Sequence, residues 1–412
     1  MRCGLLGGKL GHSYSPFIHS HLGDYSYSLF EKSPEELDDF LKYGDFTGLN
    51  VTIPYKKTVI PYCQELSQRA AQLGAVNTLV RRSDGTLIGH NTDYFGFSSM
   101  LAQTGLQVAG KKALVLGSGG ASATVSAVLK ENGADVIVIS RNGENNYNNL
   151  DRHKDAAILV NATPVGMYPD NGHSPVSLDA FPALEGVLDL IYNPARTALL
   201  IEAERRGLKT QNGLWMLVAQ AWESAQWFTG DPIDESKIAD IHNLLRCAME
   251  NIVLIGMPGC GKSTVGKRLS DKLGKTFIDA DTKIVEAAGI SIPEIFKCSG
   301  EEGFRKIETE VLRDLGAMSG IVLATGGGCV TRPENLPLLH QNGTIYYLQR
   351  DIDKLPTEGR PLSQANALSE MFRVRKPLYE CFADRIIDNN QDVDFTVNTI
   401  IHQENHYENS CD

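Results

Sequence analysis

The chain contains two glycine-rich loops of different design, each between a strand-like and a helix-like segment. Residues 112–129 read KALVLGSGGASATVSAVL, an apolar strand, a glycine turn and a helix. Residues 250–266 read ENIVLIGMPGCGKSTVG, and the stretch from Gly256 to Ser263 fits the phosphate-loop pattern G-x-x-x-x-G-K-[ST] in full. Such strand–loop–helix units belong to parallel α/β sheets, so we expect α/β folding around two separate nucleotide sites.

Short apolar strands alternate with helical segments along all 412 residues, a length typical of two to three domains. We predict a buried strand over residues 48–56 (GLNVTIPYK), ending on Lys56, and a strongly apolar helix over residues 212–230. A new strand begins at Ile252, and no linker rich in proline, glycine or serine precedes it. The two halves of the chain therefore follow each other tightly.

The composition excludes several classes of function. The net charge of -11 argues against a nucleic-acid partner, because phosphate backbones require a basic face. No apolar run approaches the ~20 residues that span a bilayer, and the first residues lack the apolar core of a signal peptide. The cysteines are scattered without a C-x-x-C pair, as in reduced cytosolic enzymes. We expect a cytoplasmic enzyme with small-molecule substrates and no membrane partner, and a homodimer stays open.

The first glycine loop predicts a dinucleotide site. Gly117 permits the tight turn, and Gly119 lets the backbone approach a pyrophosphate at the helix N-terminus. The next strand ends at Arg141 with no carboxylate beside it, and an arginine suits a ribose 2′-phosphate, so NADP is favoured over NAD. The residues predicted to hold NADP(H) are Gly117, Gly119, Gly120, Ala121, Ser140 and Arg141.

The N-terminal part supplies polar groups for the companion chemistry. Ser13 and Ser15 lie on a loop just ahead of a helix, where their hydroxyls suit a small anion or polyol. Lys56 and Asp93 each end a predicted segment, and a lysine and a carboxylate in one cleft make a proton-transfer pair.

These residues carry a family resemblance. The motifs GHSYSP, GLNVTIPYK, GAVNT, GHNTD, GSGGAS, NATPVGM, IYNP and GLWMLVAQA occur in the order and spacing of shikimate dehydrogenases, over about residues 1–245. The resemblance implies a substrate domain, an NADP domain, a returning C-terminal helix, and reduction of 3-dehydroshikimate to shikimate. It assigns Lys56 and Asp93 to catalysis. It assigns to substrate binding Ser13 and Ser15 (carboxylate), Thr52, Asn77 and Gln220 (ring hydroxyls) and Tyr192 (cleft lining). The family usually has a second basic residue after Arg141, which is missing here, so some use of NAD stays open.

The second loop predicts phosphoryl transfer. In this motif the lysine, Lys262, reaches the β/γ-phosphates and the serine, Ser263, ligates Mg²⁺. Downstream, Asp279 and Asp281 end a predicted strand, and alternation along the strand would put both on one face. One carboxylate can serve Mg²⁺ and the other can take the proton of a substrate hydroxyl. The residues predicted to hold ATP are Gly256, Gly259, Gly261, Lys262, Ser263, Thr264 and Arg360, and those for the metal are Ser263 and Asp279.

Further glycines and arginines complete this second set. Gly326, Gly327 and Gly328 follow a strand, where a ligand can approach the backbone closely. Arg305 and Arg375 suit a fork for a carboxylate.

GMPGCGKST, DAD, the FR of EEGFRKIE, GGG, GRPL and RKPLY resemble shikimate kinases over about residues 250–405. The resemblance implies that ATP and Mg²⁺ phosphorylate the 3-hydroxyl of shikimate and that Arg360 belongs to a lid. Asp281 and Lys262 would be catalytic, and the substrate would be held by Asp281, Arg305, Gly327, Gly328 and Arg375.

We therefore predict an α/β fold: a shikimate-dehydrogenase-like substrate domain, a Rossmann NADP domain, and a P-loop kinase domain resembling nucleoside-monophosphate kinases. The predicted limits are 1–97 with 214–246, 98–213 and 250–405, followed by a tail over 406–412. The predicted function is bifunctional: reduction of 3-dehydroshikimate, then phosphorylation of shikimate. Two alternatives stay open: a quinate/shikimate dehydrogenase joined to a kinase for another small polyol acid, or one half acting as a non-catalytic regulatory module.

Overall fold

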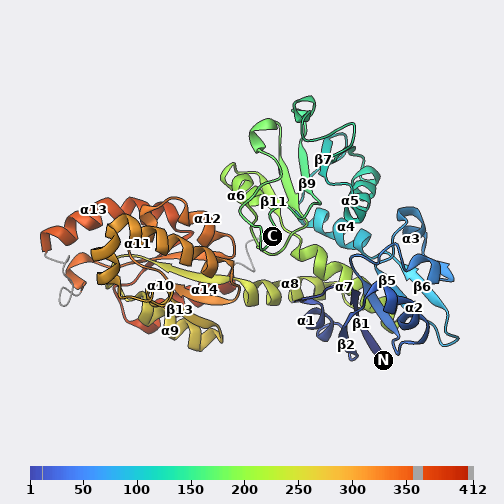
Figure 1. The fold of residues 1–412 in the computed structure, drawn as a ribbon, viewed down its shortest axis with the longest axis horizontal. Coiled ribbons are helices and arrows are strands. Elements are labelled where there is room, and N and C mark those ends of the chain that lie inside the picture. Colours follow the sequence, from blue (N-terminus) through green and yellow to red (C-terminus); the bar gives the residue numbers. More distant parts are fainter. Residues whose placement is uncertain (12, 356–364, 407–412) are drawn as a thin grey trace. The chain divides into compact units, whose positions relative to one another are not determined.

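The computed structural model describes residues 1–11, 13–355 and 365–406 (Figure 1). The chain divides into two compact units. Unit 1 comprises Met1–Tyr192 and Leu199–Leu244, and unit 2 comprises Asn193–Ala198 and Leu245–Asp412. The helix α8 (Ser236–Met249) contains the residues at which the chain passes from the first unit to the second.

The first sheet of unit 1 has the strand order β2-β1-β3-β5-β6-β4. Strands β2, β1 and β3 run parallel, and β5 is antiparallel to both β3 and β6. The aliphatic side chains of Leu6, Leu37, Leu49 and Leu79 form its core. Its strands are β1 (Arg2–Gly7), β2 (Ser26–Glu31), β3 (Gly48–Val51), β4 (Glu65–Leu66), β5 (Thr78–Arg81) and β6 (Leu87–His90), and its helices are α1 (Ser15–Ser20), α2 (Pro34–Tyr43) and α3 (Gln68–Leu73).

The strand predicted over residues 48–56 is shorter in the structure, where β3 ends at Val51. Pro54 follows shortly after and has no N–H group with which to continue the ladder. The expectation that Lys56 ends a strand is therefore wrong. Lys56 lies in a turn, where its carbonyl accepts a hydrogen bond from the Val76 N–H at 2.8 Å.

The second sheet of unit 1 is parallel throughout, with the order β11-β10-β9-β7-β8. Alternate residues of β7 enter different cores: Val115 packs with Val125, whereas Leu114 packs with Ile139. Burial on both faces explains why its strands are apolar without a break. The strands are β7 (Lys112–Leu116), β8 (Asp135–Ile139), β9 (Ile158–Asn161), β10 (Gly186–Asp189) and β11 (Lys209–Gln211), and the helices are α4 (Asp93–Gln103), α5 (Gly120–Glu131) and α6 (Ala198–Arg205).

The apolar helix predicted over residues 212–230 is α7 (Leu214–Thr229). It returns from the second sheet to the first, where it packs against α1, β3 and β5 as well as against α4. A Cβ atom on Gly48 of β3 would lie 2.2 Å from the ring of Phe228, so the glycine makes room for this helix. Helix α7, although distant in the sequence, thereby packs against two strands of the first sheet.

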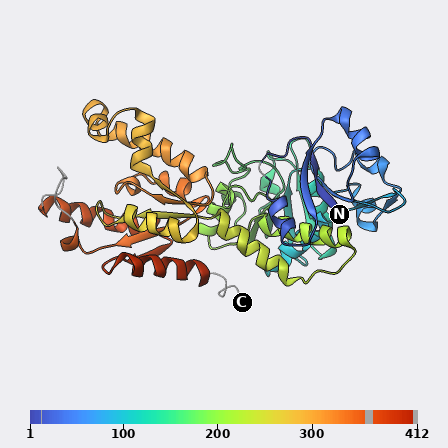
Figure 2. The same ribbon diagram turned by 90° about the horizontal axis from the view of Figure 1, so that it is seen from below.

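Unit 2 is built on a parallel sheet of order β13-β14-β12-β15-β16. Helices α9 and α14 pack side by side, and α12 and α13 pack against β15 (Figures 1 and 2). Helix α11 is interrupted at Gly300, whose φ of 66° is outside the helical region. The strands are β12 (Asn251–Ile255), β13 (Thr276–Asp279), β14 (Ile321–Ala324), β15 (Gly343–Gln349) and β16 (Arg385–Asp388), and the helices are α9 (Lys262–Leu273), α10 (Ala280–Ala288), α11 (Ile292–Ala317), α12 (Asn335–His340), α13 (Ala365–Phe382) and α14 (Val393–His406).

The predicted α/β class is confirmed in both units by these sheets. Within the described ranges, no helix combines the length and the apolar character needed to cross a membrane.

Candidate active sites

The lysine and carboxylate predicted to transfer a proton in unit 1 are in direct contact. Lys56 Nζ donates to Asp93 Oδ2 at 2.6 Å. Asp93 is the first residue of α4, where the helix dipole favours its negative charge. The two side chains are 26% and 12% exposed, so the pair is accessible from one side only and a substrate carbonyl can approach it.

The amide side chains of Asn77 and Gln220 lie together next to the residue that precedes Asp93. Asn77 Nδ2 donates to Thr92 Oγ1 at 3.1 Å and to Gln220 Oε1 at 3.4 Å. Asn77 Oδ1 accepts from the Thr92 N–H at 2.7 Å, directly before Asp93. The first sheet, the start of α4 and helix α7 therefore meet at one polar cluster, which is suited to ring hydroxyls.

The predicted carboxylate-binding serines lie at the start of α1. Ser13 Oγ hydrogen-bonds Ser15 Oγ at 3.2 Å, and between them Tyr14 meets Tyr192 edge-on with ring centroids 6.2 Å apart. Burial raises the pKa of Tyr192, so its phenol stays protonated. Thr52 follows β3, and its N–H donates to Leu6 O at 2.9 Å. These residues lie close to the carboxyl ends of β1 and β3, the usual ligand edge of parallel strands.

The glycine loop of the second sheet has space for a phosphate. Gly117 has a φ of 104°, and a Cβ there would lie 3.1 Å from Ala162 O, so the turn requires glycine. Gly119 caps α5, and a Cβ on either Gly119 or Gly120 would meet nothing within 4 Å. The loop also follows β7, at the point where the strand order reverses between β8 and β9.

The predicted 2′-phosphate residues follow β8. The Ser140 N–H donates to Asn145 O at 3.1 Å, which closes the loop that begins here. Arg141 is exposed, and its guanidinium is open to an incoming anion.

Two residues near the Lys56–Asp93 pair were missed by the sequence reasoning. Glu223 of α7 is largely buried, and burial, with a smaller effect of the Asp93 carboxylate, raises its pKa to about 7. His90 stacks on Trp227 of the same helix with ring centroids 3.9 Å apart, and burial lowers the pKa of His90 to about 4. The signal for Glu223 was a lone carboxylate in an apolar helix, three residues after Gln220.

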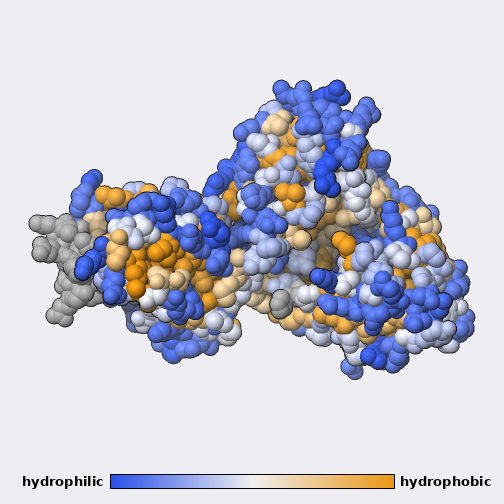
Figure 3. Space-filling view, in the orientation of Figure 1, coloured by the Kyte–Doolittle hydropathy of each residue, from blue (hydrophilic) through white to orange (hydrophobic). Residues whose placement is uncertain are grey.

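In unit 2, the predicted kinase residues other than Gly256 and Arg360 line one pocket of about 530 Å³. Apolar surface lies over the region of α10 and α11 (Figure 3), and the partly exposed Phe296 of α11 lines the pocket. The pocket is lined by Pro258, Gly259, Gly261, Lys262, Ser263, Thr264, Asp279, Asp281, Ile292, Phe296, Phe304, Arg305, Glu308, Thr325, Gly326, Gly327, Gly328 and Arg375.

Lys262 hydrogen-bonds to the backbone of the phosphate loop to which it belongs. Gly256, Gly259 and Gly261 have φ values of 145°, 83° and 99°, which other residues rarely adopt. Lys262 is buried, and its Nζ donates to the carbonyls of Gly256 at 2.9 Å and Met257 at 3.1 Å. The ammonium group therefore lies against the backbone of the loop that would receive phosphates.

The predicted metal ligands are adjacent. Ser263 Oγ donates to Asp279 Oδ2 at 2.7 Å, so both oxygens fit within the coordination shell of one Mg²⁺. The expectation that Asp281 shares a strand face with Asp279 is wrong. Strand β13 ends at Asp279, which caps α10 by accepting from the Asp281 N–H at 3.0 Å, and Asp281 lies in the first helical turn.

Asp281 nevertheless faces the glycine loop after β14. A Cβ on Gly326 would lie 2.9 Å from both Asp281 Oδ1 and Glu308 Oε1, so the two carboxylates flank this glycine. Glu308 was missed by the sequence reasoning, although its spacing of three residues from Arg305 on a helix was the available signal.

The two predicted arginines converge on the same loop. Arg305 donates to Glu308 Oε2 at 2.7 Å, and Arg375 donates to Gly327 O at 3.2 Å. A Cβ on Gly328 would lie 2.0 Å from the Arg305 guanidinium. Arg305 Nε and Glu308 Oε1 are buried without a hydrogen-bond partner in the described part of the chain, as expected where a polar ligand would bind.

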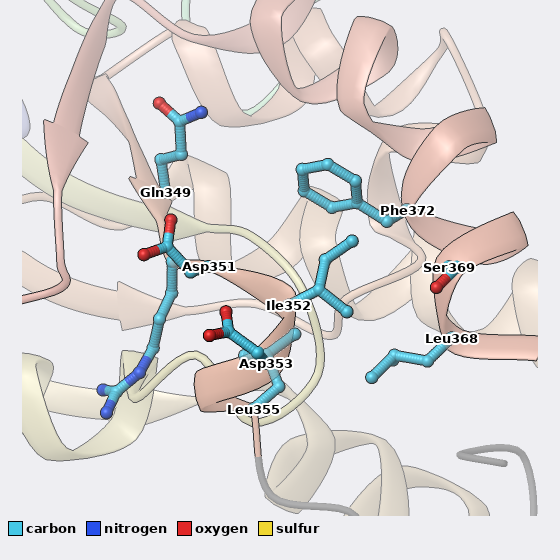
Figure 4. A pocket seen from close by; sticks show the side chains of 9 residues that line it. Gln349, Asp351, Ile352, Asp353, Leu355, Leu368, Ser369 and Phe372 are labelled. Carbon is cyan, nitrogen blue, oxygen red and sulfur yellow. The ribbon is translucent and has the colours of Figure 1, made fainter. Parts of the chain in front are cut away.

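Arg360 lies outside the described residues. Unit 2 has a second pocket of about 590 Å³, in which the side chains of Ile352, Leu368 and Phe372 face one another (Figure 4). Its polar lining consists of Gln349, Arg350, Asp351, Asp353 and Ser369. The phosphate loop and the predicted metal ligands line the other pocket, of about 530 Å³.

Comparisons with known proteins find relatives of both parts of the chain. A shikimate dehydrogenase (NADP(+)) of Clostridium perfringens is 35% identical over 266 residues, which cover 59% of this chain and 98% of that protein. The chain belongs to the shikimate dehydrogenase family. Residues 5–79 match the shikimate dehydrogenase substrate binding domain, and residues 258–404 match shikimate kinase. The chain is thus a dehydrogenase joined to a kinase domain, a bifunctional enzyme of the shikimate pathway.

Solved structures support the dehydrogenase fold. Shikimate dehydrogenase 1 of Peptoclostridium difficile is 39% identical with a TM-score of 0.55, covering 60% of this chain and 97% of that one. The Thermus thermophilus shikimate 5-dehydrogenase, in complex with NADP(H) and shikimate, is 33% identical with a TM-score of 0.55, covering 59% and 99%. The predicted family relation and fold class are confirmed.

Proposed function

We propose that unit 1 reduces 3-dehydroshikimate to shikimate with NADPH and that unit 2 phosphorylates the 3-hydroxyl of shikimate with ATP and Mg²⁺. The observation that carries the proposal is that each unit holds a complete set of groups. Unit 1 has the Lys56–Asp93 pair, and unit 2 has a basic pocket with paired metal ligands. A decayed regulatory module would be expected to lose such residues first.

In the dehydrogenase, NADPH supplies the hydride when bound. Lys56 donates the proton to the carbonyl oxygen, and Asp93 orients the ammonium through its 2.6 Å hydrogen bond. Asn77, Gln220 and Thr52 hold the ring hydroxyls, Tyr192 lines the cleft, and Ser13 and Ser15 hold the carboxylate. The open backbone at Gly119 and Gly120, with Gly117 and Ala121, fits the pyrophosphate, and Ser140 and Arg141 fit the 2′-phosphate.

In the kinase, the loop of Gly256, Gly259, Gly261, Lys262, Ser263 and Thr264 holds the phosphates, with Arg360 of the lid. Mg²⁺ neutralises phosphate charge when it is held by Ser263 and Asp279. Asp281 takes the proton of the 3-hydroxyl, and Arg305 and Arg375 hold the carboxylate next to the backbone of Gly327 and Gly328. We also propose the domain limits 1–97 with 214–246, 98–213 and 250–405.

A coupled assay with 3-dehydroshikimate, NADPH and ATP–Mg²⁺ tests both reactions. We expect shikimate 3-phosphate to accumulate. Lys56→Ala should abolish NADPH oxidation and spare phosphorylation of added shikimate, and Lys262→Ala should do the reverse. The exposed neighbours Lys57 and Lys267 give the controls Lys57→Ala and Lys267→Ala, which should leave both reactions intact.

The same assay identifies a wrong assignment. If quinate and NAD were converted faster than shikimate and NADP, the proposed substrate and cofactor would be wrong. Phosphorylation that persisted in Lys262→Ala would overturn the phosphate-loop assignment.

A further inference from the structure

Helices α4 and α7 of unit 1 pack as an antiparallel pair at very close range. Trp215, near the start of α7, donates to Ser99 Oγ at 2.8 Å. One turn earlier on α4, a Cβ on Gly96 would lie 2.9 Å from Cβ of Gln220. Later residues of α7 therefore face earlier residues of α4.

This register brings Glu223 to the catalytic pair. Gly96 lies against Gln220, and in an antiparallel pair the residues one turn away on the same faces are Asp93 of α4 and Glu223 of α7. In agreement, the Asp93 carboxylate acts electrostatically on Glu223. Since Asp93 is hydrogen-bonded to Lys56, a charge on Glu223 acts on the Lys56–Asp93 pair through Asp93.

Among the described residues, the carboxyl group of Glu223 lacks a hydrogen-bond partner for one of its oxygens. Its Oε2 is buried and has no hydrogen-bond partner within the described ranges. Burial, reinforced by Asp93, raises the pKa of Glu223 to about 7, so the side chain changes charge in the neutral range. Burying a carboxyl oxygen without a hydrogen-bond partner costs free energy, and groups with such perturbed pKa values cluster at functional sites.

Three histidines pack against α7: His90 of β6, His19 of α1, and His242 of α8, whose ring lies 5.1 Å from that of Trp215 near the start of α7. His90, the last residue of β6, and His19 of α1 are buried, and burial lowers the pKa of His90 to about 4 and that of His19 to about 3. Arg81 of β5 donates to the carbonyls of Leu41 and Gly44. The charged group that acts on Glu223 is therefore Asp93.

We propose that Glu223 is a positioning residue of the dehydrogenase site that controls, through its own proton, how tightly the Lys56–Asp93 pair holds the proton exchanged with the substrate. The inference rests on the proposed function of that pair. With Glu223 neutral, the Lys56 ammonium faces one carboxylate and gives up its proton readily. With Glu223 ionised, its negative charge adds to that of Asp93, so the pair holds the proton of the ammonium more tightly and proton donation to the carbonyl slows.

The test is the pH dependence of kcat/KM for reduction of 3-dehydroshikimate by NADPH in the full chain. We expect kcat/KM of the wild type to fall between pH 6 and pH 8. The kcat/KM of Glu223→Gln should match that of the wild type within about twofold at pH 6. At pH 8 it should exceed the wild-type value by about threefold to tenfold, because a change of one pKa unit in the proton donor changes its proton affinity about tenfold. Glu223→Met, equally without charge, should show the same difference.

Controls separate this role from a structural one. The exposed Glu235 gives the matched control Glu235→Gln, which should follow the wild-type profile. Parallel wild-type and Glu223→Gln profiles, or an equal loss of rate at every pH, would overturn the inference. If Glu223→Gln does not fold, the Glu223→Met profile decides. Full dehydrogenase activity in Lys56→Ala would instead refute the proposed function, so the two failures are distinguishable.

Discussion

Replacement of Glu223 by glutamine should stabilise unit 1 by an amount that grows with pH. Burial and the Asp93 carboxylate raise the pKa of Glu223 from 4.5 to about 7. A carboxyl with a raised pKa stabilises the folded chain below its unfolded pKa, and this contribution is lost as the pH rises through about 7. The shift of about 2.5 pH units corresponds to about 3 kcal/mol. Glutamine does not ionise, so Glu223→Gln should exceed the wild type by about 3 kcal/mol at pH 8 and by less than about 1 kcal/mol near pH 5.

The chain contains a natural probe for this experiment. Its three tryptophans, Trp215, Trp222 and Trp227, all lie on α7. Urea unfolding followed by tryptophan fluorescence therefore reports on unit 1 without a tryptophan signal from the kinase. Free energies of unfolding would be measured from pH 5 to pH 8 for the wild type, Glu223→Gln and the control Glu235→Gln. A difference between wild type and Glu223→Gln that is the same at every pH would refute the reasoning.

Three further substitutions test the nucleotide, substrate and metal assignments. Arg141→Gln should lower kcat/KM with NADPH about tenfold and leave that with NADH within about twofold, because only NADPH carries the 2′-phosphate; equal losses with both nucleotides would contradict this. Gly328→Ala should raise the kinase KM for shikimate about tenfold, because its methyl would lie 2.0 Å from the Arg305 guanidinium and displace it; an unchanged KM would argue against Arg305. Ser263→Ala should raise the Mg²⁺ concentration for half-maximal kinase activity about tenfold in a metal titration, because one oxygen ligand is removed; an unaltered requirement would exclude Ser263 as a ligand.

The parts of the sites that could be read from the sequence are those determined locally. Gly256, Gly259 and Gly261 adopt positive φ values within one short loop, so the motif itself specifies the backbone. Lys56 and Asp93 are 37 residues apart, and they were paired through chemistry and family motifs. The sequence did not reveal that a turn, instead of a strand end, presents Lys56.

The remaining groups depend on packing between elements. Glu223 lies near the catalytic pair only because α7 approaches α4 closely at Gly96, which no local pattern encodes. Glu308 likewise matters because the glycine loop after β14 lies against it. Asp281 was placed on the wrong element because a cap at Asp279 ends the strand and starts a helix within two residues.

The Asn77–Gln220 hydrogen bond joins residues 143 positions apart, and this has a consequence for biosynthesis. A ribosome adds about 5–20 residues per second. The N-terminal sheet would thus wait roughly 7–30 s after Asn77 is made before α7 is available to cover it. During that interval the apolar surface that α7 later buries is exposed on the nascent chain, so chaperone binding to ribosome-bound fragments should decrease once residue 229 has left the exit tunnel.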